Sequence, residues 1–185
     1  SLPTASINAV DSICEGDALT LVADTTFSDN VTWIFPGSSE NRLSGEAYVY
    51  TPTANDITAG QVTVELRALP IAPCADPSDT VSTTKTILIT AAPEIVNVNY
   101  PASFCEGGGL NIPLSTTADN GSVQWIKESG SGSLGNANDA NNAFYTPAAQ
   151  DYQNGSITLK LSLTGNNSCG VVSQSFTIAM YQEVT

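Results

Sequence analysis

Hydrophobic and polar residues alternate with a period of two along most of the chain. The alternation is clearest at 61–69 and 156–163, where apolar side chains hold every second position. Further alternating runs begin at Leu19, Val31 and Leu110 and cover 81–90 and 171–181. Such alternation is typical of a strand with one face in the core and one in water. Because no stretch shows a helical period, we predict an all-β protein.

The chain also repeats itself. The triplet Cys-Glu-Gly at 14–16 recurs at 105–107, the Trp of 31–34 recurs within 123–126, and Tyr-Thr-Pro at 50–52 recurs at 145–147. These similarities keep their order, which indicates two copies of one domain of about 92 residues. The joint lies near Pro93, which prevents simple continuation of the preceding strand. We therefore predict one repeat at 1–91 and a second at 92–185.

Each repeat has about seven short strands and one central Trp, which favours an antiparallel β-sandwich of immunoglobulin type. The chain is thus predicted to be two tandem immunoglobulin-like β-sandwich domains. In this interpretation four aromatic residues anchor the cores, namely Trp33, Trp125, Tyr50 and Tyr145. Asp56 and Asp151 are expected to cap a turn before the long alternating strand.

The charge balance narrows the function. Lys plus Arg number 5, Asp plus Glu number 18 and His is absent, so the net charge is −13. Such a surface repels nucleic acids and anionic lipids, and without His there is no imidazole base or metal ligand. No apolar run approaches the ~20 residues that span a bilayer. We therefore predict a non-enzymatic protein without nucleic-acid partner or membrane insertion.

Four cysteines, one pair per repeat, suggest disulfides and an oxidising compartment. In an immunoglobulin sandwich Cys14 would adjoin the turn before the second strand, whereas Cys74 would lie in the last hairpin at the opposite pole. We expect the self-contained pairs Cys14–Cys74 and Cys105–Cys169. A bond between neighbouring repeats, Cys14 with Cys169, is the open alternative.

Two further sets of residues are candidates for binding. Calcium, the possible cofactor, would use carboxylates such as Glu15, Asp17, Asp76, Asp79 and Asp139, although solvated acidic loops are the alternative reading. The segment 129–142 is the largest difference between the copies and is rich in Gly, Ser and Asn. We expect it to be an adhesive loop, with candidate contacts at Ser129, Asn136, Asn138, Asp139 and Asn142.

The order Cys-Glu-Gly-Asp, Trp, Tyr-Thr-Pro-x-Ala-x-Asp-Ile-x-x-Gly-x-Val-Thr-Val, Cys resembles tandem immunoglobulin-like repeats of large Bacteroidetes cell-surface proteins, such as the SprB-type gliding-motility adhesins. The resemblance covers 14–74 and 105–169, and repeat two departs from it at Gly108 and Tyr152. It implies a filamentous, outer-membrane-associated surface protein exported by the type IX system.

The leading hypothesis is therefore a structural and adhesive module of a surface filament, which contacts neighbouring repeats and binds a surface or polysaccharide by weak multivalent contacts. The alternative is a carbohydrate-binding module attached to a secreted enzyme. Such a module needs exposed aromatic rings, for which Phe27, Tyr100 and Tyr152 are the candidates. Residues 1–12 lack a basic start and a long apolar run, so we expect them not to be a signal peptide and the chain to be part of a longer protein.

Overall fold

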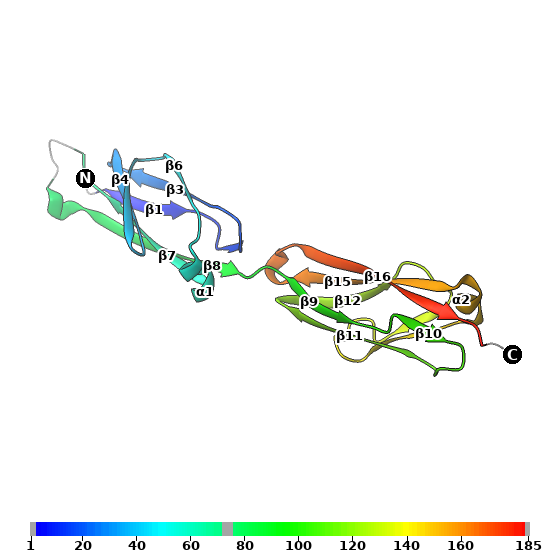
Figure 1. Cartoon of the computed structure of the whole chain (residues 1–185). Coiled ribbons are helices and arrows are strands. Elements are labelled where there is room, and N and C mark those ends of the chain that lie inside the picture. Colours follow the sequence, from blue (N-terminus) through cyan, green and yellow to red (C-terminus); the bar gives the residue numbers. More distant parts are fainter. Residues whose placement is uncertain (1–2, 72–75, 184–185) are drawn as a thin grey trace. The chain divides into compact units, whose positions relative to one another are not determined.

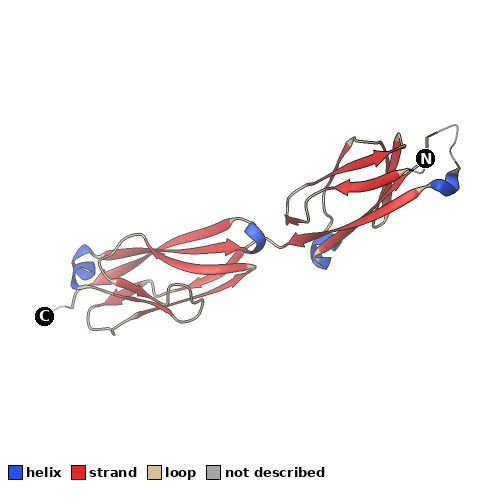
Figure 2. Cartoon of the chain, turned by 180° about the vertical axis from the view of Figure 1, so that it is seen from behind, coloured by secondary structure: helices blue, strands red, loops and turns tan. Residues whose placement is uncertain are grey.

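The computed structural model describes residues 3–71 and 76–183. It divides into two compact units, Ser1–Ala91 and Ala92–Thr185. Strands dominate both units (Figures 1 and 2). The prediction of an all-β protein is confirmed.

Unit 1 is a sandwich of two sheets. One sheet has the order β1-β3-β6 and the other the order β2-β8-β7-β4-β5. Their bounds are β1 (Thr4–Asn8), β2 (Ser12–Cys14), β3 (Leu19–Thr26), β4 (Asn30–Phe35), β5 (Ser38–Leu43), β6 (Ala47–Tyr50), β7 (Gln61–Ala68) and β8 (Val81–Thr90).

Unit 2 repeats this arrangement with sheets β13-β14-β11-β9 and β10-β16-β15-β12. Their bounds are β9 (Glu94–Asn99), β10 (Ser103–Cys105), β11 (Ile112–Asp119), β12 (Gly121–Lys127), β13 (Ser133–Gly135), β14 (Ala143–Thr146), β15 (Ser156–Gly165) and β16 (Val171–Tyr181). Each unit thus has eight strands in its described part, rather than about seven. One pairing in each unit is parallel, β2 with β8 and β10 with β16, and the other pairings are antiparallel.

Each unit has its own hydrophobic core between its two sheets. Trp33 is fully buried with Leu19, Leu66 and Ile87 in unit 1, and Trp125 is buried with the equivalent residues of unit 2. The alternation places these side chains inward, as expected for half-buried strands. Leu110 is an exception, because it is 78% exposed and strand β11 begins only at Ile112.

A short helix precedes the longest strands, α1 (Ala54–Ala59) in unit 1 and α2 (Ala149–Asn154) in unit 2. The sequence predicted only a turn there, since six residues are too few to show a helical period. Thr53 caps α1, and Gly60 ends it in the left-handed conformation at φ 70°. Two single-turn 3-10 helices, η1 (Pro77–Asp79) and η2 (Asn166–Ser168), lie before β8 and β16.

Candidate functional site

The first cysteine of each repeat lies where the last strand of its unit ends. Strand β2 pairs in parallel with β8, which places Cys14 beside Thr90. Strand β10 pairs in the same way with β16, which places Cys105 beside Tyr181. The turns that follow are also alike, because Glu15 N donates to Thr90 O and Glu106 N donates to Tyr181 O, each at 2.8 Å.

Cys169 lies at the other end of unit 2, where the chain enters it. It follows η2 in the hairpin between β15 and β16, which is closed by Gly165 N donating to Gly170 O at 2.8 Å. A Cβ added to Gly165 would lie 2.9 Å from the Cys169 carbonyl oxygen and 3.1 Å from Pro93 Cδ. Cys169 and the start of unit 2 therefore share this end of the sandwich.

The oxidation states of these cysteines correct the predicted pairing. Cys14 and Cys169 are disulfide-bonded, whereas Cys105 is a free and exposed thiol. A Cys105–Cys169 bond is therefore wrong, because the 11 residues of β16 separate the two cysteines. At about 3.3 Å per residue that strand spans roughly 35 Å, far more than the ~7 Å between Cα atoms that a disulfide tolerates. Cys74, the predicted partner of Cys14, lies outside the described residues.

A buried tyrosine–aspartate pair fixes the helical corner of each unit. In unit 1, Asp56 accepts hydrogen bonds from Tyr50 OH at 2.7 Å and from the backbone and hydroxyl of Thr53, both at 2.8 Å. Burial acts to raise the pKa of Asp56, but the hydrogen bonds from Tyr50 and Thr53 outweigh it and hold the pKa below its usual value. Burial and the Asp56 carboxylate raise the pKa of Tyr50 to about 12.

The equivalent pair in unit 2 has more donors. Asp151 is fully buried and accepts from Tyr145 OH at 2.9 Å and from Ala148 N at 2.9 Å. It also accepts from Ser131 N at 2.5 Å and Gly132 N at 3.1 Å, which ties the segment 129–142 to α2. Burial opposes the charge of Asp151, and these hydrogen bonds still lower its pKa. The predicted turn-capping Asp56 and Asp151 are thus buried acceptors that organise a structural corner.

The two buried tyrosines should ionise late in an alkaline titration. The folded-state pKa values of Tyr50 and Tyr145 are both raised, so folding favours their protonated forms. Their contribution to stability is present below the unfolded tyrosine pKa of about 10 and is lost as the pH rises above it. We expect absorbance at 295 nm to show an early group of tyrosines and a late group that titrates with unfolding. Replacing Tyr50 by Phe should reduce the late group, and unchanged late absorbance would contradict the assignment.

The five acidic candidates for calcium do not come together. Glu15 and Asp17 follow Cys14 at the end of β8, whereas Asp76 and Asp79 precede its start. Ten residues of β8 separate the two pairs, about 30 Å at the rise of a strand. In the described part of the chain, no group of three or more Cys, Asp or Glu side chains is placed to hold a metal ion.

Asp139, the fifth candidate, is occupied by its own loop. One carboxylate oxygen accepts from Asn141 N at 2.8 Å and Asn142 N at 2.9 Å. These backbone hydrogen bonds lower the pKa of Asp139, since they favour its charged form. The side chain therefore acts as a loop cap in this conformation.

The segment 129–142 is an ordered part of unit 2. It contains β13, which pairs with β14. Trp125 donates from its backbone to Ala137 O at 2.7 Å and from its indole to Asp139 O at 2.9 Å. The segment therefore completes the surroundings of the central Trp, a role that its irregular composition did not reveal.

The two tryptophans form a matched pair for testing this contact. Trp33 is equally buried, but no described residue accepts a hydrogen bond from its indole nitrogen. Replacing either Trp by Phe removes similar apolar area, whereas only the change at 125 also breaks a hydrogen bond. We expect Trp125→Phe to cost about 1 kcal/mol more than Trp33→Phe. Denaturant unfolding of the two variants measures the difference, and equal costs would show that the indole hydrogen bond contributes nothing net.

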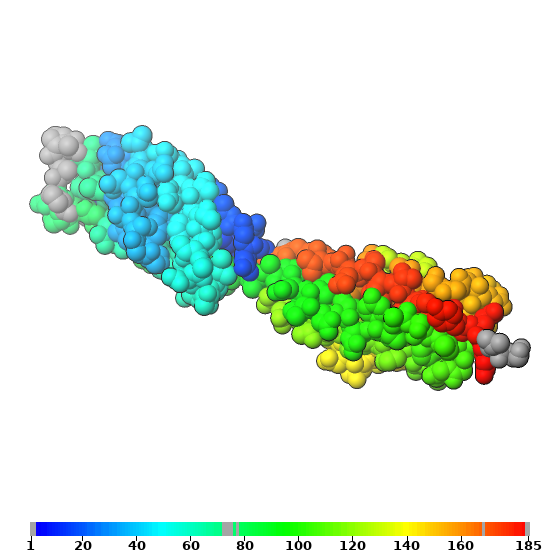
Figure 3. Space-filling model, in the orientation of Figure 1, coloured from blue at the N-terminus to red at the C-terminus, as the bar shows by residue number. Residues whose placement is uncertain are grey.

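Part of the segment still offers its side chains to solvent. Ser129, Asn136, Asn138 and Asn142 are exposed, and Asp139 is half-buried. The segment around residue 140 reaches the surface of unit 2 as the yellow atoms of Figure 3. A surface hollow of about 660 Å³ lies beside it, lined by Ala118, Gly121, Ser122, Val123, Gln124, Asn138, Ala140 and Thr164. The predicted adhesive residues thus border a hollow of small and polar groups.

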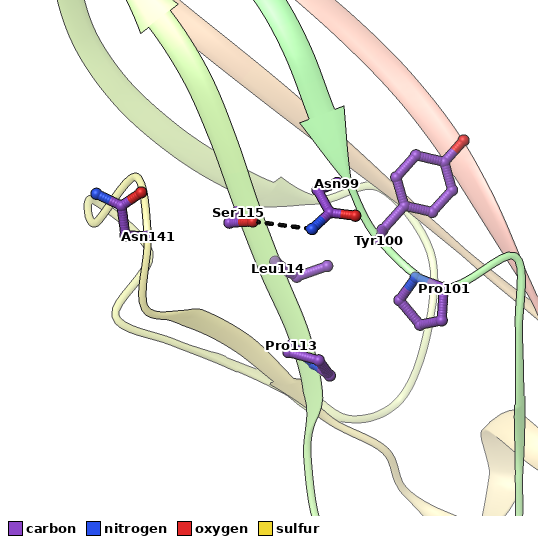
Figure 4. A pocket seen from close by; sticks show the side chains of 7 residues that line it. All are labelled: Asn99, Tyr100, Pro101, Pro113, Leu114, Ser115 and Asn141. Atoms are coloured by element: carbon purple, nitrogen blue, oxygen red, sulfur yellow. Dashed lines mark hydrogen bonds between the residues drawn. The ribbon is translucent and has the colours of Figure 1, made fainter.

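The candidate aromatic residues for sugar binding do not form a platform. Phe27 is 57% exposed, but Tyr100 stacks on Phe176 with ring centroids 4.2 Å apart, and Tyr152 packs against the core of unit 2. A cavity of about 280 Å³ lies next to Tyr100. Figure 4 shows Asn99 and Ser115 facing each other across it, joined by a hydrogen bond of 3.3 Å, with Asn141 on the loop side. Its volume is below the ~300–1,000 Å³ of typical ligand pockets.

Comparison with known proteins places the fold. No family model and no curated protein matches the chain. Among solved structures, 99% of the chain aligns with 25% of the N-terminal eight immunoglobulin domains of Down Syndrome Cell Adhesion Molecule, at 14% identity and a TM-score of 0.57. The titin I-band fragment I67–I69 matches 97% of the chain over 66% of its own length, at 12% identity and a TM-score of 0.54. Rst D1–D2 matches 99% of the chain over its whole length, at 11% identity and a TM-score of 0.51.

These similarities show the fold. The prediction of immunoglobulin-like β-sandwich repeats is confirmed, since two of these structures are named as immunoglobulin or cell-adhesion domains and the strand topology is a two-sheet sandwich in each unit. No helix in the described residues has the length and apolar character required to cross a bilayer.

Proposed function

We propose that the chain is a structural and adhesive repeat module of a long filament on a bacterial cell surface, of the SprB-type gliding-motility kind and exported by the type IX system. The observation that carries the proposal is the equivalence of the two units at their ends. In each, the first cysteine sits beside the last residue of the final strand and begins the same turn. Units with matched ends are suited to being joined in series.

Adhesion in this proposal is distributed over many weak contacts. The exposed amides of 129–142 border a hollow, and no deep apolar pocket accompanies them in the described residues. Weak contacts gain strength when many copies bind one surface together. We therefore expect no single side chain to control attachment.

An adhesion measurement tests this model. Beads carrying the chain at several densities are pressed on glass and on agar polysaccharide, and the detachment force is recorded. We expect the force to rise steeply with density and to change less than about twofold for Asn138→Ala, because multivalent binding dilutes each contact. Asp139→Ala is the matched control, since it disturbs the conformation of the loop instead of an exposed amide. Attachment lost through one point substitution such as Tyr152→Ala, with the fold retained, would show a discrete site.

The alternative function is that of a carbohydrate-binding module on a secreted enzyme. The exposed ring of Phe27 and the cavity beside Tyr100 are the features that favour it. A glycan array probed with the chain discriminates the two functions. One selective glycan bound below millimolar concentration would favour the carbohydrate-binding module, and uniformly weak binding would favour the filament.

Calcium as a cofactor stays a prediction from the acidic composition. A ligand that binds only the folded state must raise its melting temperature. Melting curves in calcium and in a chelator test this directly. A rise in calcium would support a site, and equal melting temperatures would exclude one.

A further inference from the structure

The oxidation states of the cysteines permit only one pairing within the chain. The chain has four cysteines, of which Cys105 is free while Cys14 and Cys169 are bonded. If Cys74 bonded to either one, the other would have no partner left. The bond therefore joins Cys14 to Cys169, the first cysteine of repeat one to the second cysteine of repeat two.

The geometry of each unit, taken separately, agrees with this pairing. Cys14 lies beside Thr90 at the end of unit 1 where its chain leaves. Cys169 lies in the hairpin that packs next to Pro93, where the chain enters unit 2. Thr90 and Pro93 are three residues apart, so the extended chain between them spans at most about 10 Å. The bonded cysteines thus belong to the two ends that the short linker connects.

Cys105 has the same backbone setting as Cys14 but lacks a partner in this chain. It occupies the same strand position, beside Tyr181, and Gly108 N donates to its carbonyl at 2.9 Å as Asp17 N donates to that of Cys14 at 3.0 Å. Its side chain is exposed, whereas that of Cys14 is half-buried. A position that is bonded in one copy and open in the other indicates a site that is completed from outside the chain.

We propose that the disulfides form a staggered series along the filament, in which the first cysteine of each repeat bonds the second cysteine of the repeat that follows. Cys105 then bonds the second cysteine of a following repeat of the same kind, and Cys74 bonds the first cysteine of a preceding one. This extension rests on the proposed function as an array, whereas the bond at the joint within the chain does not. Each joint is crossed by both the backbone and a disulfide, which limits bending.

The bond at Cys105 forms by thiol–disulfide exchange. The two cysteine thiols lose two protons and two electrons in forming one S–S bond, and the electrons reduce a disulfide oxidant such as oxidised glutathione to two thiols. An oxidising compartment supplies the oxidant. The exposed thiol of Cys105 is accessible to this chemistry.

The first test maps disulfides in the purified chain. Cleavage at acidic residues is suitable, since the chain holds 18 acidic and only 5 basic residues. We expect one Cys14–Cys169 peptide and two alkylated free thiols, at Cys74 and Cys105. Peptides joining Cys14 to Cys74, or Cys105 to Cys169, would overturn the proposal.

The second test uses another copy of the chain as the following repeat. Concentrated protein is treated with oxidised glutathione and separated without reductant. We expect a ladder of disulfide-linked multimers joined through Cys105 and Cys74, at least tenfold reduced by Cys105→Ser. The matched variant Cys14→Ser should lose the bond within the chain and keep the multimers. Dimers joined only through two Cys105 residues, or no multimers, would overturn the staggered series, and both outcomes are read without an adhesion assay.

Discussion

Replacing Asp151 by Ala is expected to destabilise unit 2 by about 4 kcal/mol. The substitution leaves Ser131 N, Gly132 N, Ala148 N and Tyr145 OH without their shared acceptor in a place where Asp151 is fully buried. Each buried donor left unpaired costs about 1–3 kcal/mol, and water reaches some of them in part. Urea unfolding followed by Trp125 fluorescence measures the loss. A cost below about 1 kcal/mol would show that the corner does not depend on this carboxylate.

Asp56→Ala is the matched control in unit 1. Asp56 accepts from Tyr50 and twice from Thr53, whose side chain is exposed, so water can replace part of what is lost. We expect a cost of about 2 kcal/mol, half of that for Asp151→Ala. A larger cost in unit 1 than in unit 2 would contradict the ranking by buried donors.

The same carboxylates should make both units sensitive to acid. The folded-state pKa values of Asp56 and Asp151 are lowered, so their contribution is fully present above the unfolded aspartate pKa of about 3.9. It is lost as the pH falls below that value towards the folded-state pKa. The Asp151→Ala variant should therefore lose less stability than the wild-type protein between about pH 4 and pH 2. The same chemical denaturation series, repeated at these pH values, provides the comparison.

The strands could be predicted from the sequence because their cores impose a period of two. Leu66 and Leu161 face inward in central strands, and the alternation around them is uninterrupted. Elements of three to six residues left no such signal. The parallel strands β2 and β10 have three residues each, and the helices α1 and α2 have six. For α1, the residues Thr53 and Asp56 at the spacing of a capping box were the available signal.

The candidate site was less predictable, since its contacts join residues far apart in sequence. The hydrogen bonds from Ser131 and Gly132 to Asp151 depend on the path of a long irregular segment. The glycines carry a trace of this, because a Cβ on Gly132 would lie 2.1 Å from Thr146 O. Disulfide pairing failed for another reason, since counting cysteines leaves connectivity open. The opposite poles of Cys14 and Cys74 in an immunoglobulin sandwich already favoured the bond between repeats.

Replacing Trp33 by Ala is expected to unfold unit 1 and leave unit 2 folded. Trp33 is fully exposed to other core side chains and not to solvent, with 0% accessibility in the first core cluster. Truncating a buried Trp costs about 3–5 kcal/mol, which lowers the melting temperature of a domain this size by more than about 12 °C. The two core clusters share no residue, so the loss should stay in unit 1. Each unit contains one Trp, and emission from the variant therefore reports only Trp125 in unit 2.

Circular dichroism and fluorescence then separate the two transitions. We expect the far-ultraviolet signal of Trp33→Ala to lose an early component that belongs to unit 1, while the Trp125 emission melts within about 3 °C of the wild-type temperature, since distant sites behave independently. Trp125→Ala is the reciprocal control and should leave the Trp33 transition in place. If the fluorescence transition of either variant falls together with its circular dichroism transition, the repeats unfold as one cooperative body. A filament made of independently folding repeats could lose one unit under load and keep its neighbours, and that property depends on the outcome of this measurement.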